Sequence, residues 1–220
     1  MALSRLNYNS LNVTPTAGKG IGFDAGADDL AATLSGGSMT FIKKLTSDGS
    51  DATLSFVDGA SDVVLDNTYK EYLFIFNDIH PETDNVVFQF NVSIDGGDNY
   101  NIAKTTTIWR AYHNEAGDSS TFTYDGVQDL AQGTGFQTIV DALGNDNDQS
   151  VSGSLTLFDP SSTTFVKHFL STINSYYYAE FSFNYYIAGY GNTTSAVDAI
   201  QFKMSSGEIQ AGTISLYGIN

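Results

Sequence analysis

The chain has 220 residues, with 9 Lys and Arg against 25 Asp and Glu, which gives a formal net charge of −16. This charge repels nucleic acid and anionic membranes, so the sequence predicts neither as a partner. The count of 0 Cys excludes disulfides, thiolate metal sites and cysteine catalysis. We find neither an apolar signal core nor a run of about 18 apolar residues, so we expect neither export nor membrane insertion by the chain's own signals.

Residues 1–37 are predicted to form an extended N-terminal arm. Gly and Ala are spread through this segment, and its apolar residues follow no steady period. Three alternatives remain open for such an arm: a flexible tail, a strand or hook that docks on a neighbour, and a small subdomain of its own. The partner-contact candidates in the arm are four of its large apolar side chains, Leu6, Tyr8, Leu11 and Phe23.

From residue 38 onward, apolar and polar residues alternate with a period of two, as in strands with one buried face. The clearest run extends from Val86 to Ile94, where Val, Phe and Ile alternate with Gln, Asn and Ser. We expect about ten strands among eleven candidate ranges, which are 39–45, 52–57, 71–77, 86–94, 105–112, 121–124, 151–158, 165–173, 181–187, 200–204 and 212–219. Only residues 127–132 and 137–142 are compatible with a helical turn.

The strand pattern predicts one all-β domain over residues 38–220, an antiparallel β-sandwich or jelly roll. Parallel strands need crossover connections, usually helical, and the sequence supplies almost no helical pattern. We find no internal repeat, which argues against a propeller or a β-helix.

The sequence contains no arrangement of residues that indicates catalysis, and we expect a protein without enzymatic activity. The three histidines, His80, His113 and His168, do not have the spacing that places two imidazoles on one metal ion. No serine lies in a nucleophile elbow. Glu180 is the carboxylate to examine for glycosidase chemistry. We expect it at a central position of a strand over 179–183, where the alternation places it on a solvated outer face beside Ser182 and Asn184.

Two clusters of oxygen-bearing residues, at 95–101 and 145–148, raise the question of a calcium site. Calcium accepts 6 to 8 oxygen ligands in flexible geometry, but neither cluster fits an EF-hand loop. Because Asp, Asn and Gly tolerate positive φ, hairpin turns are the favoured interpretation of both. We therefore expect no cofactor and keep Ca²⁺ as the alternative.

Aromatic residues are abundant towards the C-terminal end, and exposed tyrosines are common platforms for sugars and protein partners. Alternation places half of these rings in the core, so the outward candidates are Tyr176 or Tyr177, together with Tyr186. Trp109 and Arg110 are neighbours on one strand and must face opposite sides. We expect Trp109 to be buried and Arg110 to be exposed.

Three segments resemble a β-sandwich module of structural proteins in tailed-bacteriophage virions of the marine type. They are KEYLFIFNDIHP at 70–81, VSGSLTLFDP at 151–160 and IQFKMSSGEIQAGTISLYGI at 200–219. The last is the most specific, and it follows the pattern F-x-x-x-x-G-x-I-x-x-G-T-I-x-L-Y-G-I. The resemblance extends from about residue 69 to residue 219 and carries no catalytic residues.

The resemblance implies an external virion component, either a head decoration (cement) protein or the anchor of a tail or fibre. The implied partners are major capsid or tail proteins and further copies of the chain, and the implied location is the virion, after synthesis in the host bacterial cytoplasm. An arm that orders on a neighbour suits a symmetric assembly. The alternative function is a carbohydrate-binding module, which includes recognition of a host glycan.

Overall fold

A computed structural model describes residues 20–23, 30–34 and 38–220 of the chain. The chain divides into two units, Met1–Thr40 and Phe41–Asn220. In the first unit, β1 (Gly20–Phe23) pairs antiparallel with β2 (Leu30–Leu34). Within the described residues, no helix is long and apolar enough to cross a membrane.

Thirteen further strands follow, and the pairs with a described register are all antiparallel, which confirms the predicted fold class with more strands than expected. They are β3 (Met39–Thr46), β4 (Thr53–Val57), β5 (Glu71–Pro81), β6 (Val86–Ser93), β7 (Lys104–Asn114), β8 (Ser120–Tyr124), β9 (Ala131–Gly133), β10 (Gln137–Leu143), β11 (Val151–Phe158), β12 (Lys167–Tyr177), β13 (Phe181–Gly191), β14 (Ala199–Met204) and β15 (Ile209–Ile219). The helical turn considered for 137–142 is wrong, since this segment is β10. In the other segment, 127–132, residues 127–130 form a loop and residues 131 and 132 belong to β9.

Eight of these strands have the connectivity of a jelly roll. The thirteen strands form one hydrogen-bonded network that folds into two layers, joined where Leu143 of β10 pairs with Tyr177 of β12. One layer contains the order β3-β15-β5-β11 and the other contains β4-β14-β6-β10; we describe each layer as a sheet. Renumbered one to eight along the chain, the eight strands form the orders 1-8-3-6 and 2-7-4-5. This interleaving of strands from both ends of the chain is that of two Greek keys packed face to face.

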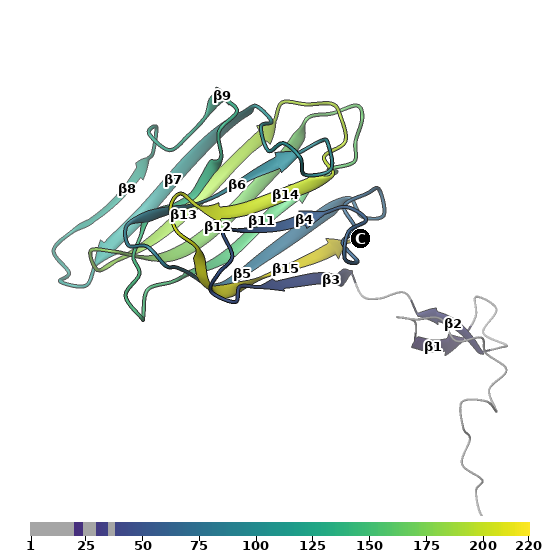
Figure 1. Cartoon of the computed structure of the whole chain (residues 1–220), viewed down its shortest axis with the longest axis horizontal. Helices are drawn as coiled ribbons and strands as arrows, with labels where there is room; N and C mark the ends of the chain where they lie inside the picture. The colour runs from purple at the N-terminus through teal and green to yellow at the C-terminus, as the bar shows by residue number, and fades with distance from the viewer. Residues whose placement is uncertain (1–19, 24–29, 35–37) are drawn as a thin grey trace, which may run out of the picture. The chain divides into compact units, whose positions relative to one another are not determined.

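The remaining five strands are insertions that widen the first sheet. β7, β8 and β9 lie between β6 and β10 in the chain, while β12 and β13 lie between β11 and β14. They add to the edge at β11 in the order β12-β13-β7, and β8 and β9 both pair with β7. In Figure 1 this extension leads away from the jelly-roll half, with β8 at its outer margin. We call the widened sheet the large sheet and β4-β14-β6-β10 the small sheet.

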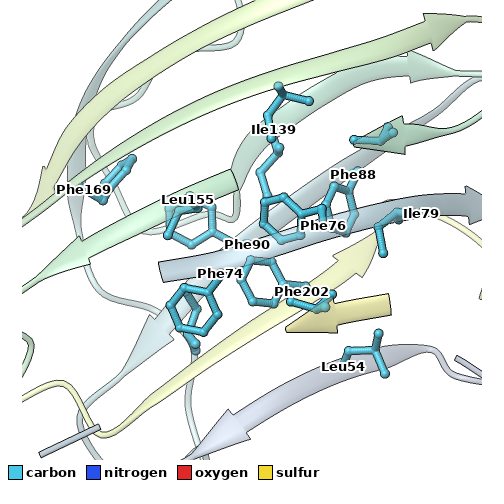
Figure 2. Close-up of a cluster of buried hydrophobic side chains, with 14 of the residues drawn as sticks. Leu54, Phe74, Phe76, Ile79, Phe88, Phe90, Ile139, Leu155, Phe169 and Phe202 are labelled. Carbon is cyan, nitrogen blue, oxygen red and sulfur yellow. The ribbon is translucent and has the colours of Figure 1, made fainter. Parts of the chain in front are cut away.

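Aromatic side chains fill the space between the two sheets. Phe74 and Phe76 from the large sheet meet Phe88 and Phe202 from the small sheet, and all four rings are fully buried (Figure 2). The Phe202 centroid lies 5.2 Å from that of Phe76 and 5.5 Å from that of Phe74. Such ring pairs stabilise the core beyond the burial of their area. Phe202, the first residue of the quoted C-terminal pattern, contacts rings from both sheets and lies at the centre of this cluster.

The other residues of that C-terminal pattern also have structural roles, because the pattern covers β15, the second half of β14 and the loop that connects these two strands of different sheets. Ile209, Ile214 and Leu216 are buried in the core. Gly212 lies at an irregularity in the pairing of β15 with β5, with φ +111°, and an added Cβ would lie 2.6 Å from the Asp78 carbonyl oxygen. At Gly218 an added Cβ would lie 2.2 Å from the Tyr69 ring. The pattern therefore specifies local packing of the jelly roll.

Candidate binding face

The outer surface of the inserted strands displays large apolar side chains to solvent. They are Trp109, Phe122, Tyr124, Leu170 and Tyr186, from β7, β8, β12 and β13, and each is more than two-fifths exposed. We call these five residues the aromatic face. Single exposed apolar residues are ordinary, but a contiguous group on one sheet marks a candidate interaction site.

The strand register explains why these side chains gather. Trp109 lies opposite Tyr186 of β13 and opposite Tyr124 of β8, so the three rings cross the sheet in one row. The Trp109 and Phe122 rings stack with centroids 5.8 Å apart and planes 8° apart. The Trp109 and Tyr124 rings meet edge to face at 5.3 Å. Because the rings support one another, they form a defined surface.

The outward positions of the strands that carry the aromatic face are uncharged, although the protein is strongly acidic. The charges beside them come from the connecting segments: Asp129 accepts a hydrogen bond from Tyr124, and Glu115 accepts one from Tyr176. By alternation, the outward positions of β7, β8, β11, β12 and β13 carry Ser, Thr, Asn, Ala, His and the apolar side chains, and none of them is Asp, Glu, Lys or Arg. The cations of these strands, Lys104, Arg110 and Lys167, occupy inward positions. Charged residues are depleted at the cores of protein interfaces, and this surface shares that property.

Two shallow depressions lie on this surface, one on each side of the small side chain of Ala188. The first has a volume of about 250 Å³ and is lined by Trp109, Tyr186 and Leu170 among others. The second, of about 360 Å³, is lined by His168, Tyr190 and Leu170 among others. Both include Thr107 and Ala188, so they adjoin. Together they form a trough with aromatic walls and hydroxyl groups.

The expectation of a buried Trp109 and an exposed Arg110 is wrong: Trp109 is exposed and Arg110 lies on the inner side of the sheet. The contacts of Arg110 explain this orientation of β7. Its Nη1 lies 2.9 Å from Asp141 Oδ2 and 3.0 Å from Asp125 Oδ2, and the Asp125 side chain is 4% exposed. Tyr185 donates a hydrogen bond to Asp141. Burial and then the charge of Asp141 raise the pKa of Tyr185 far above its ordinary value. Arg110 points inward, where its charge lies beside both acids, and Trp109 therefore faces solvent.

Lys104 is a second inward cation and has no carboxylate among its hydrogen-bond partners. Its Nζ donates to Asn91 Oδ1 at 2.5 Å and to the Ile102 carbonyl at 2.8 Å. Burial lowers the pKa of Lys104 to about 7. Asn91 is fully buried and its amide donates to the Tyr100 and Thr134 carbonyls. The pair thus fixes the loops beside β6 and β7.

The predicted tyrosines occupy different sides of the large sheet. Tyr186 belongs to the aromatic face. Tyr176 lies on the same side and donates to Glu115 Oε1 at 2.8 Å, and this hydrogen bond is the main reason that its pKa rises to about 12. Tyr177 turns inward and stacks on Phe183 at 4.7 Å between ring centroids. Tyr176 and Tyr186 are therefore the two outward tyrosines. That Tyr176, Tyr177 or Tyr186 contacts a partner stays a prediction.

The candidates in the arm are placed only in part. Leu6, Tyr8 and Leu11 lie outside the described residues, and Phe23 is the last residue of β1. Any contact that these four residues make with a partner stays a prediction.

Glu180 does not lie on a strand, contrary to the sequence-based expectation. It lies in the turn between β12 and β13, with φ 66°, and β13 begins only at Phe181. Among the histidines, His80 Nδ1 lies 2.6 Å from the Gln149 carbonyl, while His113 and His168 lie on the outer side of β7 and β12. In the described ranges, no three His, Asp or Glu side chains form a group suited to a metal ion.

The two oxygen-rich clusters form hydrogen-bonded turns. Asp95 accepts hydrogen bonds from Ser93 Oγ and from both the backbone and side-chain nitrogens of Asn99, and these bonds lower its pKa. In the second cluster, Asn145 donates to the Glu82 carbonyl and Gln149 N–H donates to the Asp146 carbonyl. These oxygens close turns, as expected of Asp and Asn at such positions.

Comparison with known proteins adds no relative to this description. The chain matches no protein-family model, no curated protein and no solved structure.

Proposed function

We propose that the chain is a non-enzymatic structural protein of a tailed-phage virion, most plainly a head decoration (cement) protein that bridges neighbouring subunits, or else a tail or fibre anchor. The observation that carries the docking role is the aromatic face, whose strands have uncharged outward positions in a chain with net charge −16. The assignment to a virion rests on the sequence resemblance. A jelly roll is common in capsid proteins, but it also occurs in lectins and cupins, so the fold alone does not select among them.

The mechanism of such a protein is mechanical. The outer surface of the large sheet would cover apolar area on a neighbouring subunit, and the unit Met1–Thr40 would supply a second attachment point. Two linked contacts bind far more tightly than either alone, because the second forms at a high effective concentration. The acidic remainder of the surface would keep free subunits apart before assembly.

A carbohydrate-binding module is the second candidate, and the trough around Ala188 favours it. Trp109, Tyr186 and Tyr190 offer ring faces, while Thr107 and His168 offer hydrogen-bonding groups. Aromatic rings with a few polar groups form ordinary small-ligand sites. Since the face is uncharged and the chain is acidic, the ligand would be a neutral glycan.

The test compares binding to purified capsids or tails that lack this protein with binding to neutral glycans. Four chains would be used: the full chain, a chain that starts at Ser38, the double variant Trp109→Ala/Tyr186→Ala, and Phe41→Ala as the matched control. Phe41 is 56% exposed on β3, at the opposite edge of the same sheet.

If the double variant loses docking on virion parts while the control retains it, the structural role is supported. Loss of docking on removal of residues 1–37 would assign the arm a part in it. If no chain docks and the intact face binds a neutral glycan, the carbohydrate-binding role replaces the structural one.

A further inference from the structure

The five-residue strand β8 is an edge strand of the large sheet, and in the described part of the chain one of its two sides has no neighbouring strand. Among the described residues, β8 pairs only with β7 (Figure 1). Its sequence is STFTY, without charge or proline, and Phe122 at its centre is 67% exposed. Natural edge strands are commonly protected from pairing by lysine, proline or a bulge. The opposite edge strand, β3, does carry Lys43 and Lys44.

The backbone groups of β8 that face the open side can be identified. Asp125 N–H donates to the Ile108 carbonyl, and the Ser119 carbonyl accepts from Asn114 N–H, so the odd-numbered residues point towards β7. Neighbouring residues of a strand direct their backbone groups to opposite sides. Ser120, Phe122 and Tyr124 therefore direct their N–H and C=O groups to the open edge.

We propose that β8 pairs antiparallel with β8 of a second copy, about a two-fold axis at Phe122. In this register Phe122 faces Phe122 of the second copy, and Ser120 faces its Tyr124. All three pairs then join residues whose backbone groups point outward, so each pair exchanges two hydrogen bonds. Thr121 lies opposite Thr123, a cross-strand pair that stabilises sheets.

Side chains and charge favour a second copy as the occupant of this edge. The outward positions of β8 continue the aromatic face, so the row from Trp109 through Phe122 would run on into Phe122 and Trp109 of the other copy. Two chains of net charge −16 repel each other. Because β8 itself carries no charge, pairing along this strand places no charged side chain directly opposite another. A two-fold contact of this kind is closed and does not propagate into a filament.

The strength of the contact follows from its size. A pairing of five residues is short, and it falls below the roughly 1,200 Å² of buried surface that stable interfaces require. We therefore expect association that depends on concentration in the micromolar to millimolar range. The contact includes Phe122 and Tyr124 of the aromatic face, but it does not require the docking role proposed above, since it joins two copies of this chain alone.

The proposal is tested by measuring the molar mass of the full chain by light scattering across that concentration range. The same measurement is made on the variants Phe122→Lys and Phe122→Glu. Residue 122 faces its own copy, so each variant opposes like charges and should weaken association by about tenfold or more, since each 1.4 kcal/mol is worth that factor. An equimolar mixture of the two variants should recover association, because lysine then faces glutamate. Phe41→Lys, an exposed aromatic on β3, is the matched control and should associate as the unchanged chain does.

Circular dichroism checks that each variant is folded. We expect all of them to fold, because Phe122 and Phe41 are exposed and their replacement leaves the core unchanged. A wild-type chain that stays monomeric throughout the range overturns the proposal, as does a Phe122→Lys variant that associates normally. If the mixture of the two folded variants remains monomeric, the register centred on Phe122 is wrong.

Discussion

Arg110 Nη1 lies 2.9 Å from Asp141 Oδ2, an ion pair that joins β7 of the large sheet to β10 of the small sheet. The same nitrogen also neutralises Asp125, and the Arg110 guanidinium lies 5.6 Å from the centroid of the Phe183 ring. This contact holds the inserted strands against the jelly roll from the inside. It leaves the outer side of β7 to Trp109.

Replacement of Arg110 by Met should cost about 3 kcal/mol of unfolding free energy, because two largely buried carboxylates lose their counter-ion. The matched control is Lys70→Met, which breaks the ion pair with Asp159. Its side chains are 71% and 39% exposed, so the expected cost is below about 1 kcal/mol. Urea unfolding of both variants measures the difference. Equal costs would mean that the Arg110 cluster does not support the inserted strands.

Trp109 is the only tryptophan of the chain and is 45% exposed, which makes its fluorescence a direct report on the aromatic face. We expect emission close to that of indole in water, with strong quenching by acrylamide in the folded protein. A partner or glycan that covers the face should shift the emission to shorter wavelength and reduce quenching. Emission typical of a buried indole in the monomer would contradict the outward orientation of Trp109.

Gly212→Ala should destabilise the jelly roll by about 3 kcal/mol, because a Cβ at φ +111° would lie 2.6 Å from the Asp78 carbonyl oxygen. Gly96→Ala is a suitable comparison, since Gly96 has φ +74° with nothing within 4 Å of the added Cβ. That variant carries only the backbone penalty of about 1 kcal/mol. Thermal unfolding of both distinguishes steric conflict from backbone strain. A Gly212→Ala protein as stable as Gly96→Ala would argue against the close approach.

Burial of Lys104 predicts a dependence of stability on pH. Its pKa is about 7 in the folded chain and about 10.4 when exposed. Between these values the unfolded state binds more protons, so the free energy of unfolding should rise with pH, by up to about 1 kcal/mol per unit from pH 7 to pH 9. The contribution is fully unfavourable below pH 7 and is relieved as Lys104 loses its proton.

Lys104→Met should flatten this rise, and Lys44→Met, at an exposed position of β3, should not. Urea unfolding at pH 7, 8 and 9 gives the three slopes. Identical slopes for wild type and Lys104→Met would show that Lys104 keeps its proton in the folded chain.

The binding face was only partly predictable from the sequence. Alternation alone places Trp109 on the side of Thr105, Thr107 and His113, which are polar, and this parity was the signal that could have identified it as exposed. The general preference of tryptophan for burial pointed the other way and was wrong here. The reason is Arg110, whose partners Asp125 and Asp141 lie 15 and 31 positions further along the chain. Similarly, the expected strand through Glu180 fails because the hairpin between β12 and β13 turns at that residue.

The period-two pattern by itself determined that the chain is all-β and antiparallel, and that Phe88, Phe90 and Phe202 face a core. Such a pattern fixes the two sides of each strand, because side chains alternate across the backbone. It does not say which strands become neighbours, since pairing is non-local. For example, β5 lies between β11 and β15, which both come much later in the chain. Leu216 of β15 lies opposite Phe74 of β5, more than a hundred positions away. Only the tertiary structure decided that the inserted strands widen one sheet, that β8 is left as an open edge, and that the uncharged side of that sheet faces solvent. It did so because Arg110, Lys104 and Lys167 obtain their hydrogen-bond partners on the inner side.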